Sequence, residues 1–223
     1  MISIAIDGPA GAGKSTIAKA LAKTLGFIYV DTGALYRAIG LYVLNKNADT
    51  LNIEKVTSLL PEIKVELKYI CDSQRVILND RDVTGDIRIP EVSMAASNVS
   101  SIKQVREFLL SLQRDIAVEN NVVMDGRDIG TVVLPLANVK IFLTASPEER
   151  ARRRYEEMMR KNMEVDYNEV LKDLKIRDYN DSNREIAPLK PTKESIIIDT
   201  TGNELKQSIK ILTNIVKEKL QLI

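Results

Sequence analysis

The chain has 223 residues, enough to bury a full core, and its 32 basic and 31 acidic residues nearly cancel. Balanced charge gives no reason to expect a nucleic acid or an anionic membrane surface as a partner. The sequence holds no histidine, which excludes a Ser-His-Asp triad, a histidine general base and an ordinary zinc enzyme site. Any catalysis must therefore use Lys, Arg and Asp, with or without a metal held by oxygen atoms.

The single cysteine and the N-terminal residues indicate the compartment. Cys71 has no second cysteine with which to pair, so an internal disulfide is excluded and a reducing compartment is favoured. A signal peptide requires a basic region before its apolar run, and the short apolar run at the N-terminus has none. No apolar run approaches the ~18 residues that a membrane helix needs. We predict a soluble, cytoplasmic protein.

The first 45 residues have the pattern of an α/β fold. The apolar run at 2–6 predicts a buried parallel strand, and apolar residues at helical spacing predict a helix over 14–26 that stops at Gly26. A second buried strand at 27–30 and a helix at 33–45 follow. Strand, loop and helix thus occur twice in succession.

The pattern then changes. Residues 62–88 alternate apolar and polar side chains in short bursts, which predicts antiparallel hairpins inserted into the fold. A long helix is predicted around 101–119. The segment 147–185 is helical and highly charged with few large apolar residues, so we expect it to bury little and to form a mobile, solvated flap. Three more apolar strands are predicted at 122–124, 139–143 and 195–199.

The stretch GPAGAGKST (8–16) matches the phosphate-binding loop motif G-x-x-x-x-G-K-[ST]. Its glycines let successive backbone N–H groups point at phosphate oxygens at a helix N-terminus. Lys14 would neutralise the β- and γ-phosphates, and the Ser15 hydroxyl could ligate Mg²⁺. Asp125 ends the apolar strand VVM, where aspartates of this fold reach the same metal or form a turn. A nucleoside triphosphate and Mg²⁺ are therefore predicted.

The loop does not reveal which group receives the phosphate. The stretch NKNAD (45–49) resembles a guanine-reading motif, but its Asp is one position late and it follows a helix. The predicted flap is rich in arginine, which can mean a solvated charged helix. The run lacks the regular Glu-to-Lys spacing of a self-paired helix, so arginines that stabilise a transferring phosphoryl group are the alternative. These arginines are Arg150, Arg152, Arg153, Arg154, Arg160, Arg177 and Arg184.

Several blocks together resemble the bacterial cytidylate kinase family, in order and over nearly the whole chain. Besides the loop they are DTGALYRA (31–38), DGRDIGTVV (125–133), LTASPEERARRR (143–154) and RDYNDSNREIAPL (177–189). The resemblance implies transfer of phosphate from ATP to CMP or dCMP with Mg²⁺. Such a transfer needs no general base, because the acceptor phosphate is already ionised near neutral pH.

The resemblance also implies a fold and a division of the chain. The fold is α/β: a five-stranded parallel sheet forms a P-loop core that carries an inserted, hairpin-rich nucleoside-monophosphate-binding domain and a short helical lid. The core is expected at 1–32, 102–146 and 186–223, the monophosphate-binding region at 33–101 and the lid at 147–185. Both arms would close to exclude water, since an open site would waste ATP.

On the donor side, the resemblance assigns roles to the loop and to several arginines. Ser15 and Asp125 would hold Mg²⁺, and sequence does not rank the arginines at 150–154. The groups expected to act on the transferred phosphate are Lys14, Arg127, Arg150, Arg153 and Arg154. The loop residues expected to bind ATP are Gly8, Pro9, Ala10, Gly11, Ala12, Gly13, Lys14, Ser15 and Thr16.

On the acceptor side, Arg37 and Arg127 match arginines that hold the phosphate of CMP. Thr32 departs from the serine frequent in the family but keeps the hydroxyl. The positions that match contacts to the cytosine ring are Thr32, Arg106, Asp128 and Arg184. The positions that match contacts to the sugar are Ser97, Arg177 and Asp181.

Two other functions stay open from sequence. One is a kinase specific for UMP or AMP, and the other is a P-loop regulatory switch whose flap binds a protein partner. The partners expected for the first choice are small molecules, CMP and dCMP, with no nucleic acid and no membrane. Balanced charge and the lack of a coiled-coil repeat favour a monomer.

Overall fold

The structure is a computed structural model that describes residues 1–70 and 73–221, so Cys71 lies outside the described residues. The chain forms two compact units. The first unit contains Met1–Tyr29 and Asn120–Ile223, and the second is the continuous segment Val30–Glu119. The two units are described separately below.

The sheet of the first unit confirms the predicted parallel core. β1 (Ser3–Asp7) pairs in parallel with β6 (Val122–Gly126) on one side and with β7 (Val139–Thr144) on the other. β8 (Ile196–Asp199) extends the sheet beyond β7, and β2 (Ile28–Asp31) completes the strand order β2-β6-β1-β7-β8. Because parallel strands are buried on both faces, they read in the sequence as continuous apolar runs.

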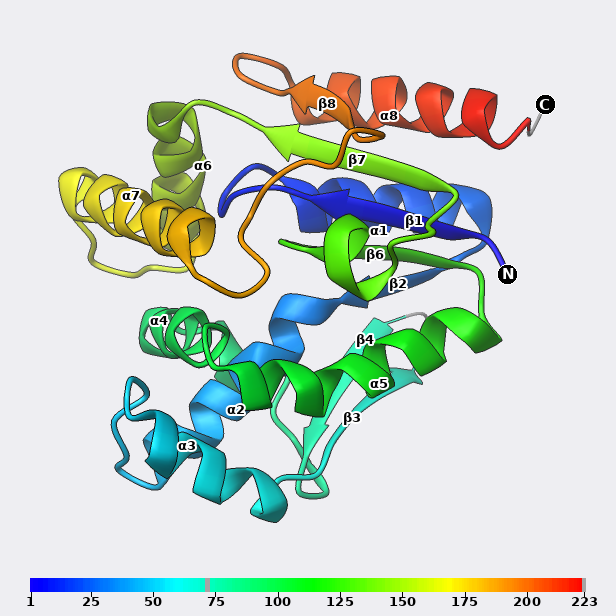
Figure 1. Ribbon diagram of the computed structural model, residues 1–223. Coiled ribbons are helices and arrows are strands. Elements are labelled where there is room, and N and C mark those ends of the chain that lie inside the picture. The colour runs from blue at the N-terminus through cyan, green and yellow to red at the C-terminus, as the bar shows by residue number, and fades with distance from the viewer. Residues whose placement is uncertain (71–72, 222–223) are drawn as a thin grey trace. The chain divides into compact units, whose positions relative to one another are not determined.

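Helices cover this sheet (Figure 1). α1 (Lys14–Leu25) ends at Gly26 in the left-handed conformation, as its sequence predicts. It packs against α8 (Leu205–Lys219), and their apolar residues share one core with the strands. The residues in this core include Ile4, Ile6, Ile17, Leu21, Leu143, Leu212 and Val216.

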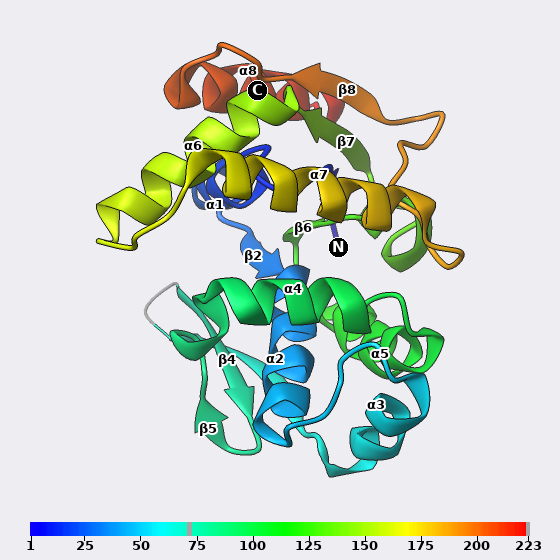
Figure 2. The same cartoon turned by 90° about the vertical axis from the view of Figure 1, so that its left-hand side faces the viewer.

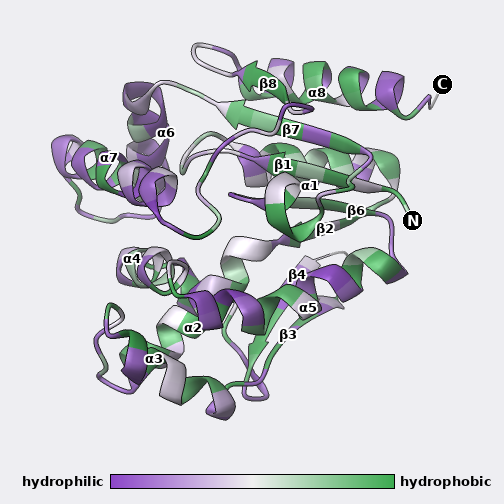
Figure 3. Ribbon diagram, viewed as in Figure 1, coloured by the Kyte–Doolittle hydropathy of each residue, from purple (hydrophilic) through white to green (hydrophobic). Residues whose placement is uncertain are grey.

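α6 (Pro147–Arg160) and α7 (Tyr167–Asn183) correspond to the predicted flap, and they lie side by side (Figure 2). Figure 3 shows both helices as mostly hydrophilic. The expectation that this segment buries little is confirmed, since few residues within 147–185 are buried. The helices have a small core of their own with the phosphate-binding loop, because a few well-spaced apolar side chains suffice for a two-helix contact. Its buried members are Ala10, Ala151, Met158, Val170 and Leu174.

The second unit contains the predicted antiparallel insert. β3 (Val65–Ile70), β4 (Ser73–Leu78) and β5 (Arg81–Asp82) form a three-stranded antiparallel sheet. The sequence pattern also predicted α2 (Thr32–Asn45), the helix that opens this unit ahead of the three strands. It did not predict α3 (Ile53–Leu59), α4 (Pro90–Val99) or two short 3₁₀ turns, Leu60–Glu62 and Asp86–Arg88.

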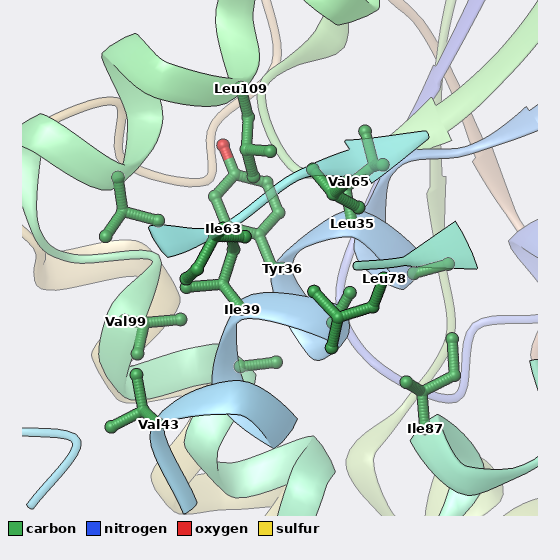
Figure 4. Packing of buried hydrophobic residues seen from close by; sticks show 14 of the residues in the cluster. Leu35, Tyr36, Ile39, Val43, Ile63, Val65, Leu78, Ile87, Val99 and Leu109 are labelled. Atoms are coloured by element: carbon green, nitrogen blue, oxygen red, sulfur yellow. The ribbon is translucent and has the colours of Figure 1, made fainter. Parts of the chain in front are cut away.

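α5 (Lys103–Glu119) belongs to the second unit, although it was expected to begin the returning part of the core. The reason is its apolar face. Val105 and Leu109 lie in the same cluster as Tyr36 and Ile39 of α2. Figure 4 shows Leu109 of α5 beside Tyr36 of α2, in the same cluster as residues of β3 and β4. Burial of this face fixes α5 to the insert.

Candidate active site

The phosphate-binding loop lies where the motif requires, between β1 and α1. Gly8 has φ of 148°, and a Cβ built on it would lie 1.9 Å from the carbonyl oxygen of Leu143, so only glycine fits. Gly13 precedes α1 with φ of 89°. The loop therefore leads its backbone into a helix N-terminus, the arrangement that binds phosphate.

Lys14, the first residue of α1, is only 6% exposed. Its Nζ donates a hydrogen bond to the carbonyl oxygen of Pro9 at 2.7 Å. Burial and, to a smaller extent, the nearby Arg127 lower the pKa of Lys14 to about 7, although the surrounding carboxylates raise it. An anion at this position would favour the charged lysine. A bound phosphate would therefore stabilise the charge of Lys14.

Ser15 and Asp125, the two predicted metal ligands, lie side by side. The Ser15 hydroxyl donates to Oδ2 of Asp125 at 2.9 Å, and the Tyr29 hydroxyl donates to Oδ1 at 2.9 Å. A hydroxyl and a carboxylate are ligands that Mg²⁺ accepts, with the remaining positions taken by water and phosphate oxygens. Among the described residues no group of three or more His, Cys, Asp or Glu could hold a metal alone. The pair fits a metal that arrives with a nucleotide.

Arg127 and Asp181 form a buried ion pair beside Lys14. Nε of Arg127 donates to Oδ2 of Asp181 at 2.8 Å, and its Nη1 donates to the carbonyl oxygen of Gly126 at 3.2 Å. Burial raises the pKa of Asp181, but Arg127 and, to a smaller extent, Arg184 and Arg177 hold it below its ordinary value. The structure thus brings together four of the predicted acceptor residues of this unit.

Asp128 and Arg184 form a second, looser pair. Oδ1 of Asp128 lies 3.5 Å from Nη2 of Arg184, and both side chains are 6% exposed. Nε of Arg184 donates to the carbonyl oxygen of Ala187 at 2.7 Å. Both predicted base-contact residues of this unit are therefore adjacent.

The three predicted arginines of α6 have different surroundings. Arg150 is 3% exposed, and it donates to the carbonyl oxygens of Ala145 (2.8 Å) and Ala10 (3.0 Å). Its Nη2 lies 2.6 Å from Oδ2 of Asp178 in α7. Arg150 therefore joins α6, α7 and the loop.

Arg153 and Arg154 are more exposed than Arg150. Arg153 donates from Nη2 to the Thr200 carbonyl oxygen at 2.6 Å and from Nε to Glu149 at 2.9 Å. Arg154 pairs with Glu157 at 3.0 Å on its own helix. Arg152 likewise pairs with neighbours three and four residues away. The expectation that this run lacks self-pairing is wrong, because glutamates lie three or four residues from these arginines, the helical spacing that brings side chains together.

The second unit holds the other predicted residues. Thr32 is buried at the start of α2, and Asp31 caps the helix by accepting from the Ala34 N–H at 3.1 Å. Nη2 of Arg88 lies 3.0 Å from Oδ2 of Asp31. Burial raises the pKa of Asp31, but Arg37 and Arg88 hold it below its ordinary value. Two arginines thus face one carboxylate at this helix end.

Arg106 and Ser97 also lie in the second unit. Arg106 is buried, with its guanidinium 5.6 Å from the centre of the Tyr36 ring, and Nη1 donates to the carbonyl oxygen of Ser100 at 3.1 Å. The Ser97 hydroxyl is shielded from solvent and has no hydrogen-bond partner within the described part of the chain. Such a group is suited to a ligand.

Sequence reasoning missed four residues that contact the predicted site residues or the backbone beside them. Asp7 and Asp31 follow apolar strands, which was a usable signal, since strand ends meet at the edge of a parallel sheet where sites form. Tyr29 and Arg88 carried no such signal. Tyr29 lies within an apolar run, and Arg88 lies in a charged turn.

A P-loop lysine beside a metal-suited pair and buried arginines defines the class, a nucleotide-binding phosphotransferase of P-loop fold. The fold alone is similar to a shikimate kinase from Bacteroides thetaiotaomicron, with a TM-score of 0.50 at 14% identity over 99% of both chains. The model of the cytidylate kinase family matches residues 4–218, so the chain belongs to the cytidylate kinase family.

Two relatives carry the same name. The chain is 54% identical to a cytidylate kinase of Caldicellulosiruptor saccharolyticus over 206 residues, which are 92% of this chain and 91% of the relative. It is 48% identical to a cytidylate kinase of Carboxydothermus hydrogenoformans over 216 residues, 97% of each chain. In the described residues no helix is long and apolar enough to cross a membrane.

Proposed function

We propose that this member of the cytidylate kinase family transfers the γ-phosphate of ATP to CMP or dCMP, giving ADP and CDP or dCDP. The observation that carries the proposal is the family match over 4–218, joined to a site that holds Lys14, Arg127 and Asp181 together. Phosphate-to-phosphate transfer needs positioning and charge stabilisation more than proton transfer. The histidine-free site is suited to that chemistry.

On the donor side, the loop residues Gly8 to Thr16 bind the triphosphate in this proposal. Lys14 neutralises charge on the β- and γ-phosphates, and Arg127, Arg153 and Arg154 stabilise charge on the transferred group. Arg150 was predicted to act there too, but its contacts with three protein oxygens favour a role in holding the loop. Ser15 and Asp125 would hold Mg²⁺, which neutralises phosphate charge when bound.

The acceptor proposal rests on matched hydrogen bonding. Cytosine has an amino donor at N4 and acceptors at N3 and O2, whereas uracil has a carbonyl at C4 and an N–H at N3. Asp128 accepts only and suits the amino group, and Arg106 donates only and suits the acceptors. The wrong base would leave buried groups unpaired and be rejected. The other proposed contacts are Thr32 and Arg184 to the ring, Arg37 and Arg127 to the phosphate, and Ser97, Arg177 and Asp181 to the sugar.

ADP release from ATP and Mg²⁺ in the presence of CMP, dCMP, UMP or AMP tests the function. Strong stimulation by CMP and dCMP is expected. Stimulation by UMP or AMP alone would favour a kinase of other specificity, and stimulation by none would favour a regulatory switch. Lys14→Ala serves as the control, because it should abolish any release that comes from this site.

The setting in which the protein works is also a proposal. A single cysteine and balanced charge support a cytoplasmic monomer. Light scattering after size-exclusion chromatography tests the oligomeric state, and a mass near twice the 25.0 kDa of the chain would contradict it.

A further inference from the structure

Asp7 is a buried carboxylate to which the proposed mechanism gives no role. It is the last residue of β1, directly before the phosphate-binding loop. Its Oδ1 accepts a hydrogen bond from the backbone N–H of Ile129 at 2.8 Å, and its Oδ2 accepts one from the N–H of Gly130 at 2.8 Å. One side chain therefore satisfies two consecutive N–H groups from a distant part of the chain.

These two N–H groups open a single π-helical turn, Ile129–Val133, which Asp128 precedes. The first N–H groups of a helical turn have no partner within the turn. A carboxylate that accepts from both gives two charge-assisted hydrogen bonds and fixes the backbone direction at Ile129. Arg127 and Asp128 are the residues immediately before this fixed point. Their backbone is therefore held from one side by Asp7.

The position is unfavourable for an isolated carboxylate. Burial raises the pKa of Asp7 to about 6, although the Gly130 and Ile129 N–H groups lower it. Asp128 raises it further, and Lys14 lowers it. A neutral apolar residue would avoid this desolvation but would leave both N–H groups without a partner. The geometry therefore indicates that the carboxylate is needed to accept hydrogen bonds from both N–H groups of the turn.

We infer that Asp7 is a positioning residue for the acceptor nucleotide, although it adjoins the donor loop. It holds the 129–130 backbone so that Arg127 and Asp128 keep their orientation. This inference rests on the proposed function, in which those two residues bind the phosphate and base of CMP. The end of β1 would then serve both nucleotides. Gly8 begins the loop that binds ATP, and the Asp7 side chain positions the residues that bind CMP.

Asp7→Asn tests this role. The amide keeps one acceptor oxygen, but its NH₂ group would face the second backbone N–H, so one hydrogen bond is replaced by two opposed donors. We expect the Kd of CMP by calorimetry and the KM for CMP to rise about tenfold, as losing one buried hydrogen bond predicts. The KM for ATP should stay within about twofold, because the loop backbone is unchanged and Asp7 is only a minor support for the charge of Lys14.

Asp49→Asn is the matched control. Asp49 is a carboxylate of the second unit that accepts one backbone N–H, from Leu51 at 2.9 Å, in an exposed turn. Equal rises in the KM for ATP and CMP in Asp7→Asn would overturn the inference, as would unchanged binding of CMP. If Asp7→Asn does not fold, amide hydrogen exchange of the wild type is the deciding measurement. Fast exchange of the backbone N–H groups of both Ile129 and Gly130 would show that Asp7 does not hold this turn, and would overturn the inference.

The outcomes also separate this inference from the proposed function. A wild-type protein that does not use CMP would contradict the function itself. A wild type that uses CMP, together with an Asp7→Asn variant of unchanged CMP affinity, would contradict only the role of Asp7.

Discussion

Two buried cations of the first unit, Lys14 and Arg150, differ in how many protein oxygens they contact. Lys14 at the start of α1 donates to one carbonyl oxygen, and burial destabilises its charge. Arg150 in α6 donates to two carbonyl oxygens and pairs with Asp178. Protein oxygens thus satisfy Arg150, whereas Lys14 gains most from an anionic ligand. Two cations that were both predicted to act on the transferred phosphate therefore differ in what they can offer a substrate.

Lys14→Ala should have the largest effect. It removes the loop's own cation from the phosphates, so we expect kcat to fall by about two orders of magnitude or more, as for other well-placed electrostatic groups (about 3 kcal/mol). Steady-state kinetics with CMP measures the effect. The exposed Lys23→Ala on the same helix is the control. A Lys14→Ala variant within about threefold of wild type would show that the lysine is not catalytic.

Arg150→Lys tests the other member of the comparison. A lysine cannot reach both carbonyl oxygens and Asp178 at once, so at least one of these buried oxygens loses its partner. We expect the free energy of unfolding to fall by about 2 kcal/mol, measured by urea denaturation. Arg152→Lys, in an exposed pair on the same helix, should cause no measurable change. Wild-type stability with a strongly reduced kcat would instead make Arg150 a residue that acts on the phosphate.

Asp128→Asn tests base selection by a third buried charged residue, which pairs loosely with Arg184. The new NH₂ group would oppose the N4 amino group of cytosine but suit the O4 atom of uracil. The KM for CMP should therefore rise about tenfold, with that for UMP much less affected. The ratio of kcat/KM values for CMP and UMP is the measurement. Equal losses on both substrates, beside an unaffected Asp115→Asn control on α5, would contradict base selection by Asp128.

Proton uptake sharpens the account of Lys14. With a pKa of about 7, Lys14 is about one-tenth protonated at pH 8, and bound phosphate should restore its charge. ATP binding should then take up protons at pH 8 and far fewer at pH 6, where the lysine is already charged. Calorimetry in buffers of different ionisation enthalpy measures this uptake. The same uptake by Lys14→Ala would assign the proton to another group.

Hydrogen exchange tests whether the α6–α7 region closes as a lid. When ATP and CMP are both bound, amides within 147–185 should exchange more slowly than in the free protein. Either nucleotide alone provides the control. Unchanged exchange would contradict the lid without affecting the kinase function.

The parallel strands and the loop were predictable because each depends on a short, local pattern. A buried strand needs one apolar run, and the motif fixes glycines at set positions. α3 and α4 were missed because their burial depends on the whole second unit. The surroundings of each arginine were equally hidden. Only the structure shows that Arg150 meets α7 and the loop, whereas Arg152, on the opposite side of α6, is exposed.

The roles of Asp7 and Asp31 show a further limit. The sequence places both at strand ends, but only the structure shows that Asp7 holds a distant backbone turn and that Asp31 pairs with Arg88. Hydrogen bonds between residues far apart in sequence leave no periodic signal. Such contacts come from the tertiary fold, which single-sequence patterns do not encode.

The second unit is one uninterrupted segment, Val30–Glu119, and this affects the order of folding. A ribosome completes this segment before it makes β6, so the second unit can fold while β1 still lacks its neighbours. Ile2 and Asn121, which hydrogen-bond in the finished protein, are 119 residues apart. Prior folding of the insert shortens the flexible chain between them and so reduces the entropy lost when β1 and β6 pair. We expect the nascent chain to acquire the insert first and the nucleotide-binding sheet last.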